Sequence, residues 1–460
     1  MGTPSWPAPP GSFLAACRRV VGGDDVLVDP EVTASYVTDW TGRFTGSTPA
    51  VVRPGSTAEV AELVALAREH AVALVPQGGN TGLVAGAVPL AGEVVVSMAR
   101  LSDLGPVDRL AGQVTAGAGA TLAGLAAHAA ASGLAFGVDL GSRDSATVGG
   151  MVATNAGGLH VVRHGAMRAQ VVGVEAVLGT GQVISRLGGL IKDNTGYDLA
   201  QLLCGSEGTL GVVTAARLRL VAPPAQVVTA LVGVGTVEGA VALAAELRRA
   251  LTDLQALELM TGPSLRLVAD HLSAPPPVAP DAGAYLLVEV GAAVDPLPGL
   301  AAAIDGAAGV LDTAVATERA DRTRLWRWRE AHSEAAAPLG SVHKLDVTLP
   351  AGEMARFCAD VVDRVAVARP GATMLLFGHV GDGNVHVNVV GPPADDEGVD
   401  DVVLALVVER GGSISAEHGI GTLKRRWLER DRSAAEVAAM RSIKAALDPD
   451  AILNPGVLLP

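Results

Sequence analysis

The chain has 460 residues, of which 49% are hydrophobic, and it contains 56 glycines and 27 prolines. This apolar content excludes disorder over most of the chain, and the length indicates two or three domains. The formal net charge of -14 disfavours nucleic acids and anionic membrane surfaces as partners, because like charges repel.

Cysteine usage and the amino terminus bear on location. Cys17, Cys204 and Cys358 lie far apart, which provides no framework for disulfides, zinc knuckles or iron–sulfur clusters. Met1–Pro10 has no basic stretch followed by an apolar core, and no later apolar run approaches the roughly 18 residues of a membrane-spanning helix. We expect a cytoplasmic protein with no transmembrane segment.

The first predicted elements form a β-α-β unit. Residues 51–54 are typical of a strand, 57–70 of a helix with apolar residues at helical spacing after a Ser/Thr cap, and 72–75 of a second strand. The chain then enters the loop PQGGNTG, residues 76–82, whose glycines expose backbone N–H groups. Such a loop can bind a diphosphate, although tight loops after strands are common without any ligand.

Further glycine-rich stretches follow. Residues 139–158 contain too many glycines to form a packed element, and residues 171–184 predict an antiparallel hairpin that turns at residues 179–181. Residues 205–214 pass from a glycine-rich turn into a strand. Three such loops next to strands indicate one extended ligand.

Pro223 and Pro224 interrupt this pattern and predict a domain boundary near residue 222. Beyond it we expect a helix over residues 236–250 and a strand over 285–290. The proline-rich residues 274–280 are typical of a surface loop. From Gly411 a loop precedes an Arg-rich amphipathic helix.

A predicted hairpin in the second half carries polar residues suited to chemistry. Residues 374–377 and 385–389 form its arms, and GHVGDGN forms its loop. Strand alternation puts His386 and Asn388 on one face of the second arm. His379 lies across the hairpin, where the first arm enters the loop. Two imidazoles across a hairpin can reach one metal ion, and Glu417 could supply a third ligand. The alternative is a pair of polar histidines at strand ends, with no ligand.

Two more segments carry charges that suit an acidic substrate. Residues 325–336 predict a helix in which Arg329 and Ser333, four apart, share a face. The planar guanidinium of Arg329 matches a carboxylate. Lys344 is the odd charge in an apolar strand, where the alternative is a lysine at a strand edge whose side chain extends to solvent.

The motifs PQGGNTG, TVGGMVATNAGG, GSEGTLG, GHVGDGNVH and AEHGIG occur in this order, with LNPG near the end. In this arrangement the chain resembles the FAD-linked 2-hydroxyacid dehydrogenases of the vanillyl-alcohol oxidase/p-cresol methylhydroxylase superfamily, from about residue 51 to the carboxyl end. The pattern is shared by D-2-hydroxyglutarate dehydrogenases, D-lactate dehydrogenases and the flavin subunit of glycolate oxidase.

The resemblance implies an α+β fold. We expect a two-subdomain FAD-binding domain of the p-cresol methylhydroxylase type, then an antiparallel-sheet substrate (cap) domain and a C-terminal helical segment. The expected ranges are an N-terminal segment over 1–46, the FAD-binding domain over 47–222, the cap domain over 223–410, and residues 411–460 packing back on the FAD-binding domain.

The resemblance also implies FAD binding. The implied FAD-binding residues are Gln77, Gly78, Gly79, Asn80, Thr81, Gly82, Thr147, Gly150, Thr154, Asn155, Gly158, Glu207, Val212 and Asn454. Some superfamily members tether FAD through a histidine in the first loop, and this chain has Asn80 there. We therefore expect non-covalent FAD.

By the same resemblance His379, His386 and Glu417 hold a divalent metal, with Zn expected, and His418 is the catalytic base. Coordination would make the substrate alkoxide accessible near neutral pH, so that hydride can leave C2 for the flavin. Arg329 and Asn388 would contact substrate. Relatives that use dicarboxylates have a Lys and a Thr at the places of Lys344 and Ser333. We therefore expect oxidation of a D-2-hydroxy dicarboxylate such as D-2-hydroxyglutarate, with D-lactate or glycolate as the alternatives.

Two rivals share this fold. An alkyl-glycerone-phosphate synthase would perform a non-redox transfer on a long-chain substrate. A non-catalytic flavin-binding subunit of an electron-transfer complex would lack the metal histidines, which argues against it here. The electron acceptor is expected to be electron-transfer flavoprotein or a quinone. The sequence leaves the oligomeric state open, and a homodimer is one possibility.

Overall fold

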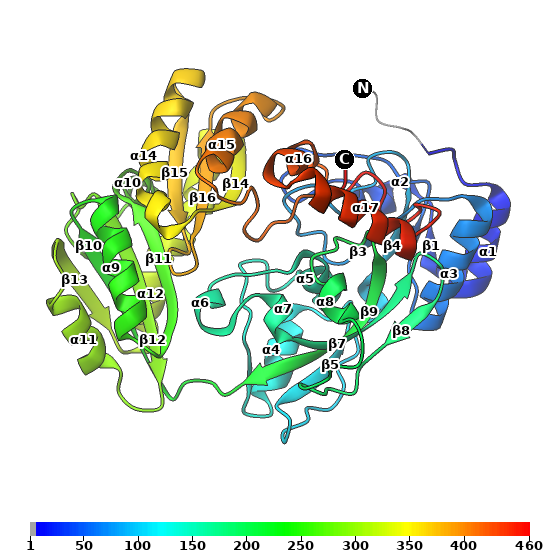
Figure 1. Ribbon diagram of the computed structural model, residues 1–460, viewed down its shortest axis with the longest axis horizontal. Coiled ribbons are helices and arrows are strands. Elements are labelled where there is room, and N and C mark those ends of the chain that lie inside the picture. Colours follow the sequence, from blue (N-terminus) through cyan, green and yellow to red (C-terminus); the bar gives the residue numbers. More distant parts are fainter. Residues whose placement is uncertain (1–5) are drawn as a thin grey trace. The chain divides into compact units, whose positions relative to one another are not determined.

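The computed structural model describes residues 6–460, which divide into two compact units (Figure 1). The first unit contains the chain up to Gly158, His164–Pro223 and Glu417–Pro460, and the second contains Leu159–Arg163 and Pro224–Ala416. The expected ranges 47–222 and 223–410 stay predictions. They differ from these units in assigning Leu159–Arg163 to the FAD-binding domain and in ending the second range at residue 410. The prediction that Met1–Pro10 is not a targeting signal falls partly outside the described residues, because these begin at residue 6.

The first unit begins with a small sheet of order β1-β2-β4-β3. Its strands are β1 (Val26–Leu27), β2 (Val51–Val52), β3 (Leu74–Gln77) and β4 (Val94–Ser97), and β4 pairs in parallel with both β2 and β3. Helix α3 (Thr57–His70) joins β2 to β3 over the predicted residues. Its N-cap is Ser56, whose hydroxyl accepts from the Glu59 N–H at 3.2 Å.

A second sheet in this unit is antiparallel, with order β5-β9-β7-β8, and β6 also pairs with β9. The strands are β5 (Gln113–Gly117), β6 (Ala135–Phe136), β7 (Val171–Leu178), β8 (Val183–Ser185) and β9 (Gly211–Val221). The pairing of β7 with β8 confirms the predicted hairpin. The strand after the third glycine-rich loop is β9, also as predicted.

The expectation that residues 139–158 hold no packed element is wrong. Helix α5 (Val148–Thr154) forms there and buries Val148, Met151 and Val152. The packing at Gly149 leaves no room for a side chain, because a Cβ at this position would lie 2.7 Å from the Ala118 Cβ. Gly149 therefore permits the close approach of a helix and does not mark an open loop.

The carboxyl-terminal segment completes the first unit. The Leu74 N–H donates to the Ile452 carbonyl at 2.8 Å, and the Asn454 N–H donates to the Leu74 carbonyl at 2.8 Å. Ile452 and Leu453 are buried in the core cluster that also contains Leu63 and Val94. The last residues of the chain thus extend the edge of the first sheet at β3.

The second unit is built on one antiparallel sheet of order β13-β10-β12-β11-β15-β16-β14. The strands are β10 (Gln226–Val234), β11 (Leu254–Thr261), β12 (Ala284–Ala292), β13 (Val310–Ala316), β14 (Val342–Thr348), β15 (Thr373–Gly378) and β16 (Asn384–Val390). The β15–β16 pairing confirms the predicted hairpin.

Helices cover both faces of this sheet. The helices are α9 (Val237–Ala250), α10 (Gly262–Leu272), α11 (Leu297–Asp305), α12 (Arg319–Glu330), α13 (His332–Ala336), α14 (Ala351–Ala368) and α15 (Glu397–Glu409), with the 3-10 turn η4 (Ala337–Leu339). Leu265 of α10, Trp328 of α12 and Ala335 of α13 share a buried cluster with Met260 and Phe377 of the strands. Helix α9 packs against β10, β11 and β12 (Figure 1).

The remaining helices and 3-10 turns lie in the first unit, except α6, most of which belongs to the second. They are α1 (Gly11–Val21), η1 (Gly23–Asp25), α2 (Pro30–Thr33), η2 (Ala34–Tyr36), η3 (Met98–Arg100), α4 (Leu122–Ala130), α6 (Val161–His164), α7 (Met167–Gln170), α8 (Leu199–Leu203), η5 (Arg425–Trp427), α16 (Leu428–Asp431) and α17 (Ala434–Leu447). Within residues 6–460, no helix has the length and apolarity needed to cross a bilayer.

Candidate active site

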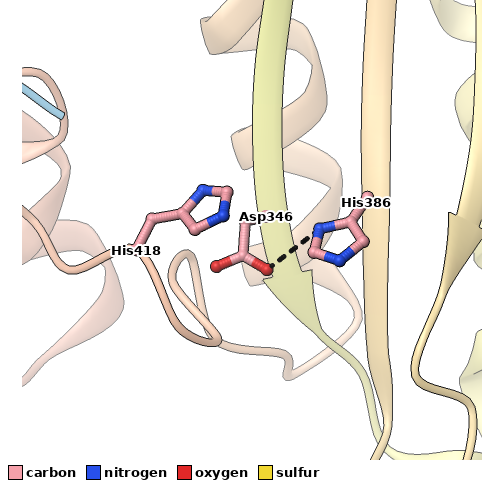
Figure 2. Close-up of side chains that lie close together, drawn as sticks. All are labelled: Asp346, His386 and His418. Carbon is pink, nitrogen blue, oxygen red and sulfur yellow. Dashed lines mark ion pairs between the residues drawn. The ribbon is translucent and has the colours of Figure 1, made fainter. Parts of the chain in front are cut away.

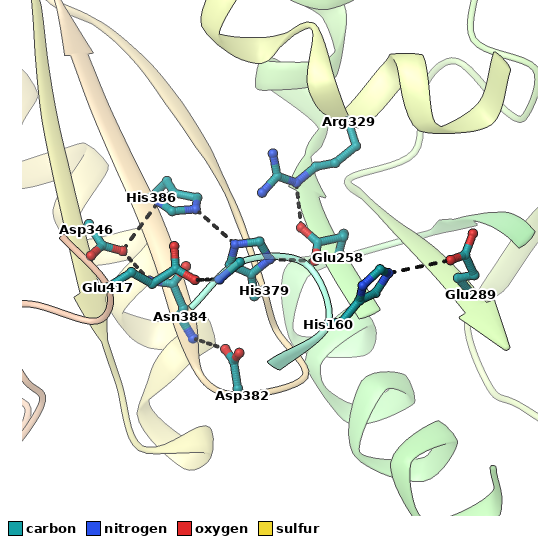
Figure 3. A network of polar contacts seen from close by, with 11 residues as sticks. His160, Glu258, Glu289, Arg329, Asp346, His379, Asp382, Asn384, His386 and Glu417 are labelled. Carbon is teal, nitrogen blue, oxygen red and sulfur yellow. Dashed lines mark hydrogen bonds and ion pairs between the residues drawn. The ribbon is translucent and has the colours of Figure 1, made fainter. Parts of the chain in front are cut away.

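Four ionisable side chains form a row across four neighbouring strands of the second unit (Figure 3). Glu258 comes from β11, His379 from the end of β15, His386 from β16 and Asp346 from β14. Glu258 Oε1 lies 2.6 Å from His379 Nδ1, the two Nε2 atoms of His379 and His386 lie 3.4 Å apart, and His386 Nδ1 lies 3.5 Å from Asp346 Oδ1. The row is therefore carboxylate, imidazole, imidazole, carboxylate.

The strand register explains why these side chains meet. His386 pairs with Phe377 on β15 and with Asp346 on β14. Asn388, two residues further on β16, pairs with Lys344 on β14. Side chains two residues apart point to the same face of a strand, so Lys344 and Asn388 extend this polar surface beside the row.

The same face carries Arg329 of α12. Its Nε donates to Glu258 Oε2 at 2.6 Å, and its guanidinium carbon lies 4.6 Å from the centre of the Phe377 ring. Glu258 is fully buried. Burial alone raises the pKa of Glu258, but His379 and Arg329 outweigh it and hold that pKa well below its usual range. Glu258 is thus a buried carboxylate anion with two cationic or donor partners.

The histidine pair has donors suited to a metal ion. A neutral imidazole that donates from Nδ1 to a carboxylate keeps its lone pair on Nε2. His379 is placed to do so toward Glu258. His386 Nδ1 faces Asp346 (Figure 2). Asp346 also accepts from Asn384 Nδ2 at 2.5 Å. In these tautomers two lone pairs face each other at 3.4 Å. A cation between them would remove that repulsion, so this donor set fits a divalent metal.

The prediction of a single helix over residues 325–336 is wrong in two respects. The helix begins earlier, at Arg319, and is interrupted at Ala331, where α12 gives way to α13. The His332 Nδ1 donates to the Arg329 carbonyl at 2.9 Å and so caps α12 with a side chain. Arg329 is 7% exposed, whereas Ser333 lies on the exposed side of α13.

The first glycine-rich loop lies in the first unit, directly after β3. The Gln77 amide donates to the carbonyls of Tyr36 and Ala87, and the Asn80 amide donates to that of Thr38 at 2.8 Å. Asn80 also adopts a left-handed backbone with φ 52°. These two side chains therefore hold the loop in shape, and the side available to a ligand is backbone.

The loop's own N–H groups fit the diphosphate of FAD. Among the residues that the structure describes, no protein acceptor bonds the N–H groups of Gly79, Asn80, Thr81 and Gly82. A Cβ on Gly79 would lie 1.8 Å from the Ser145 carbonyl oxygen, and one on Gly78 would lie 2.3 Å from Thr147 Oγ1. Gly82 opens onto free space, since nothing lies within 4 Å of its Cβ position. Clustered N–H donors of this kind bind anions.

Other predicted FAD-binding residues belong to α5 and its ends. Thr147 caps the helix by accepting from the Gly150 N–H, and the Thr154 hydroxyl donates to the Gly150 carbonyl at 3.0 Å. Asn155 ends the helix in a left-handed conformation, and its Oδ1 accepts from the Arg168 N–H at 2.8 Å. Val212 is 1% exposed in the core, so only its backbone could approach a ligand.

Glu207 and Asn454 connect the third glycine-rich loop to the carboxyl-terminal segment. Glu207 accepts from the N–H groups of Ile420 and Gly421 at 2.8 and 2.7 Å. Asn454 Nδ2 donates to the carbonyls of Gly86 and Glu207, both at 2.7 Å. Both oxygens of the Glu207 carboxylate thus hold the loop that contains His418.

Glu417 begins the last segment of the first unit. Its Oε1 accepts from the Gly158 N–H at 2.6 Å, and a Cβ on Gly157 would lie 2.6 Å from that oxygen. Gly157 and Gly158 therefore admit the Glu417 carboxylate through the absence of side chains. This places Glu417 beside the glycine-rich segment 155–158 within its own unit.

Glu258 and Asp346 were missed from the sequence. Each is an acid inside an apolar strand, in QALELMT and VHKLDVT, and each is fully buried. A charged residue in a strand of that composition requires a buried partner, which is the signal that could have found them.

Comparisons with known proteins agree with this architecture. Residues 48–186 match the FAD binding domain family, and residues 223–458 match the C-terminal domain of the FAD linked oxidases. A D-2-hydroxyglutarate dehydrogenase of Xanthomonas citri pv. viticola is 38% identical, covering 97% of this chain and 96% of the relative. A mitochondrial D-2-hydroxyglutarate dehydrogenase of Danio rerio is 34% identical over 94% of this chain and 83% of its own.

Among solved structures, p-cresol methylhydroxylase with substrate bound superposes with a TM-score of 0.78 at 14% identity, covering 98% of each chain. This likeness confirms the predicted fold class, and the two family matches confirm the expected FAD. The chain, with its FAD-binding domain and its antiparallel second unit, has the fold of p-cresol methylhydroxylase and belongs to the FAD-linked oxidases, a family of FAD-dependent oxidoreductases.

Proposed function

We propose that the protein oxidises a D-2-hydroxy dicarboxylate to the 2-oxo acid, with D-2-hydroxyglutarate as the best candidate substrate. The proposed cofactors are non-covalent FAD and a divalent metal, for which Zn is the first candidate. The observation that carries the proposal is the shared face of the second unit, which presents the His379–His386 pair together with the cations Arg329 and Lys344. The names of the relatives from Xanthomonas citri and Danio rerio support the same substrate.

When bound, FAD supplies the hydride acceptor, and the divalent metal lowers the pKa of the substrate hydroxyl. His379 and His386 would hold the metal through Nε2, and Glu417 is the proposed third ligand. Glu417 directly follows Ala416, whose N–H donates to the Asp346 carbonyl at 3.4 Å in the second unit. One peptide unit spans about 3.8 Å, so chain connectivity supports Glu417 as a ligand.

The remaining roles fall to residues of this chain. An imidazole nitrogen of His418 accepts the proton of the C2 hydroxyl. Arg329 and Lys344 bind the distal carboxylate, and the Asn388 amide orients the substrate. Ser333, on the exposed side of α13, stays a predicted substrate contact. A substrate with one carboxylate would offer no second anion to the outer fork of Arg329, which favours a dicarboxylate over D-lactate or glycolate.

The proposed FAD contacts are those of the first unit described above. The backbone of residues 77–82 is the proposed diphosphate site. The other proposed FAD contacts are Thr147, Gly150, Thr154, Asn155, Gly158, Glu207, Val212 and Asn454. Electron-transfer flavoprotein or a quinone is the proposed acceptor. A homodimer and a cytoplasmic location stay predictions.

The test is anaerobic mixing of the FAD-loaded protein with a panel of D- and L-2-hydroxy acids, with flavin absorbance as the readout. We expect bleaching by D-2-hydroxyglutarate, little by L-2-hydroxyglutarate, and weaker bleaching by D-lactate and glycolate. Metal removal by a chelator should abolish the bleaching, and Zn²⁺ should restore it. Fast bleaching that survives complete metal removal would contradict the metal-assisted mechanism.

A further inference from the structure

Glu258 occupies an unusual place, because one carboxylate serves two neighbours with different proposed roles. Its Oε1 bonds His379 Nδ1 at 2.6 Å, and its Oε2 accepts from Arg329 Nε at 2.6 Å (Figure 3). His379 is a proposed metal ligand, and Arg329 is a proposed substrate contact. Asp346, the other carboxylate of the row, bonds Asn384 instead of an arginine, so the two ends of the row differ.

We propose that Glu258 is a positioning residue that orients both the His379 imidazole for the metal and the Arg329 guanidinium for the distal carboxylate of the substrate. The inference rests on the proposed function and extends it to a residue that touches neither metal nor substrate.

The effect on His379 follows from proton placement. An imidazole donates a hydrogen bond to a carboxylate through N–H, so Glu258 fixes the proton on Nδ1 and leaves the lone pair on Nε2. Partners of this kind orient metal-binding histidines, and their loss typically weakens metal affinity by about 10- to 100-fold. With glutamine at position 258, the amide N–H₂ can turn toward Nδ1 and drive the proton to Nε2, where it would block a metal.

The effect on Arg329 follows from the shape of its guanidinium. Nε is bonded to Glu258, and the ring of Phe377 lies against the plane, with 4.6 Å from the guanidinium carbon to the ring centre. Within the described part of the chain, no protein acceptor bonds its two Nη groups. These groups form the outer fork that matches a carboxylate. Without the Glu258 anchor the fork loses its fixed direction.

Burial makes this arrangement sensitive to charge. The side chains of Glu258 and Arg329 are 0% and 9% exposed. Removing one partner of a buried ion pair leaves an uncompensated charge, so some loss of stability is expected as well. A control must therefore separate orientation from stability.

Glu289 provides that control. It lies on β12, next to β11 in the same sheet, and its Oε2 accepts from Thr229 Oγ1 and Trp326 Nε1 at 2.8 and 2.7 Å. It is a largely buried carboxylate with two donors, but it has no contact with His379 or Arg329 among its hydrogen bonds. Glu289→Gln should thus report the general cost of altering a carboxylate in this sheet.

The experiment compares wild type, Glu258→Gln and Glu289→Gln, each loaded with FAD and stripped of metal. Calorimetric titration of these samples with Co²⁺ gives metal affinity. Steady-state assays of the same proteins, reloaded with saturating Zn²⁺, give KM for D-2-hydroxyglutarate and for D-lactate. We expect Glu258→Gln to weaken Co²⁺ binding about 10- to 100-fold and to raise KM for the dicarboxylate more than for D-lactate. Glu289→Gln should change each quantity by less than about twofold.

Three results would overturn the inference. These are unchanged Co²⁺ affinity and KM in Glu258→Gln, equal losses in Glu289→Gln, or a rise in KM that is the same for both substrates. If Glu258→Gln does not fold, Glu258→Asp is measured instead. It keeps the charge but is too short to reach both partners, so wild-type values for both quantities would refute the role. A wild-type protein that binds no Co²⁺ and oxidises no 2-hydroxy acid would refute the proposed function itself.

Discussion

Lys344 on β14 lies directly opposite Asn388 on β16, on the sheet face that also carries His386. Asn388 is 3% exposed and Lys344 is half-buried, and burial lowers the pKa of Lys344. A lysine held partly out of water gains more from an anionic ligand than an exposed one does. The pair is therefore a suitable place for a substrate carboxylate.

Lys344→Ala should distinguish substrates with one and two carboxylates. A charge-assisted hydrogen bond contributes about 1.5–3 kcal/mol, so kcat/KM for D-2-hydroxyglutarate should fall about 10- to 100-fold. The value for D-lactate should fall less than about threefold. Lys192→Ala removes a lysine from an exposed loop and serves as the control. Equal losses on both substrates would refute the assignment of Lys344.

Gly79→Ala and Gly82→Ala should separate two functions of one loop, its contribution to protein stability and its binding of FAD. Alanine at position 79 places Cβ 1.8 Å from the Ser145 carbonyl, so the loop must shift and the free energy of unfolding should fall by about 1–3 kcal/mol. At Gly82 nothing in the protein lies within 4 Å. Gly82→Ala should keep apoprotein stability but bind FAD more weakly, as measured by flavin fluorescence. Unchanged FAD affinity would argue against this loop as the diphosphate site.

His332 should make stability depend on pH. Burial, together with the Arg329 charge, lowers the pKa of His332 from 6.5 to about 3. The unfolded chain therefore binds a proton below about pH 6.5 that the folded chain does not, and the stability due to neutral His332 is lost as pH falls. Between pH 6.5 and 4.5, the free energy of unfolding of wild type should fall by about 2 kcal/mol more than that of His332→Phe. Parallel denaturant-derived stability curves for the two proteins would contradict this prediction.

Glu207→Gln should loosen the loop that contains His418. Glutamine can accept only one of the two hydrogen bonds now made by the Ile420 and Gly421 N–H groups, and a buried donor left without a partner costs about 1–3 kcal/mol. We expect that loss in urea unfolding and a lower kcat. Glu436→Gln, which alters an exposed capping box on α17, should cost about 1 kcal/mol or less and leave kcat unchanged. A fully stable Glu207→Gln protein would show that the loop does not depend on this carboxylate.

Local signals predicted much of the fold. The helix over residues 57–70 and the two hairpins were predictable because their caps, turns and apolar spacing are contained within short segments. Helix α5 was not predictable in this way, because its glycine at position 149 is explained by the close approach of Ala118, about 30 residues away in the chain. Glycine content alone does not distinguish a flexible loop from a closely packed helix.

The candidate site likewise has residues that the sequence could group and residues that it could not. His379, His386 and Asn388 belong to one hairpin, so alternation along a strand was sufficient to group them. Glu258 precedes His379 by 121 residues, and only the order β11-β15-β16-β14 makes them neighbours. The carboxylates that orient the histidines depend on strand order, which no short sequence pattern specifies.

The discontinuity of the first unit has a consequence for biosynthesis. Residues 417–460 are translated last, yet they supply the partner of the β3 edge through Ile452 and Asn454, and they receive the Glu207 carboxylate. A nascent chain that has emerged only to Pro223 lacks these hydrogen bonds. We therefore expect flavin uptake to be post-translational, with truncation before Glu417 yielding a colourless protein that chaperones retain.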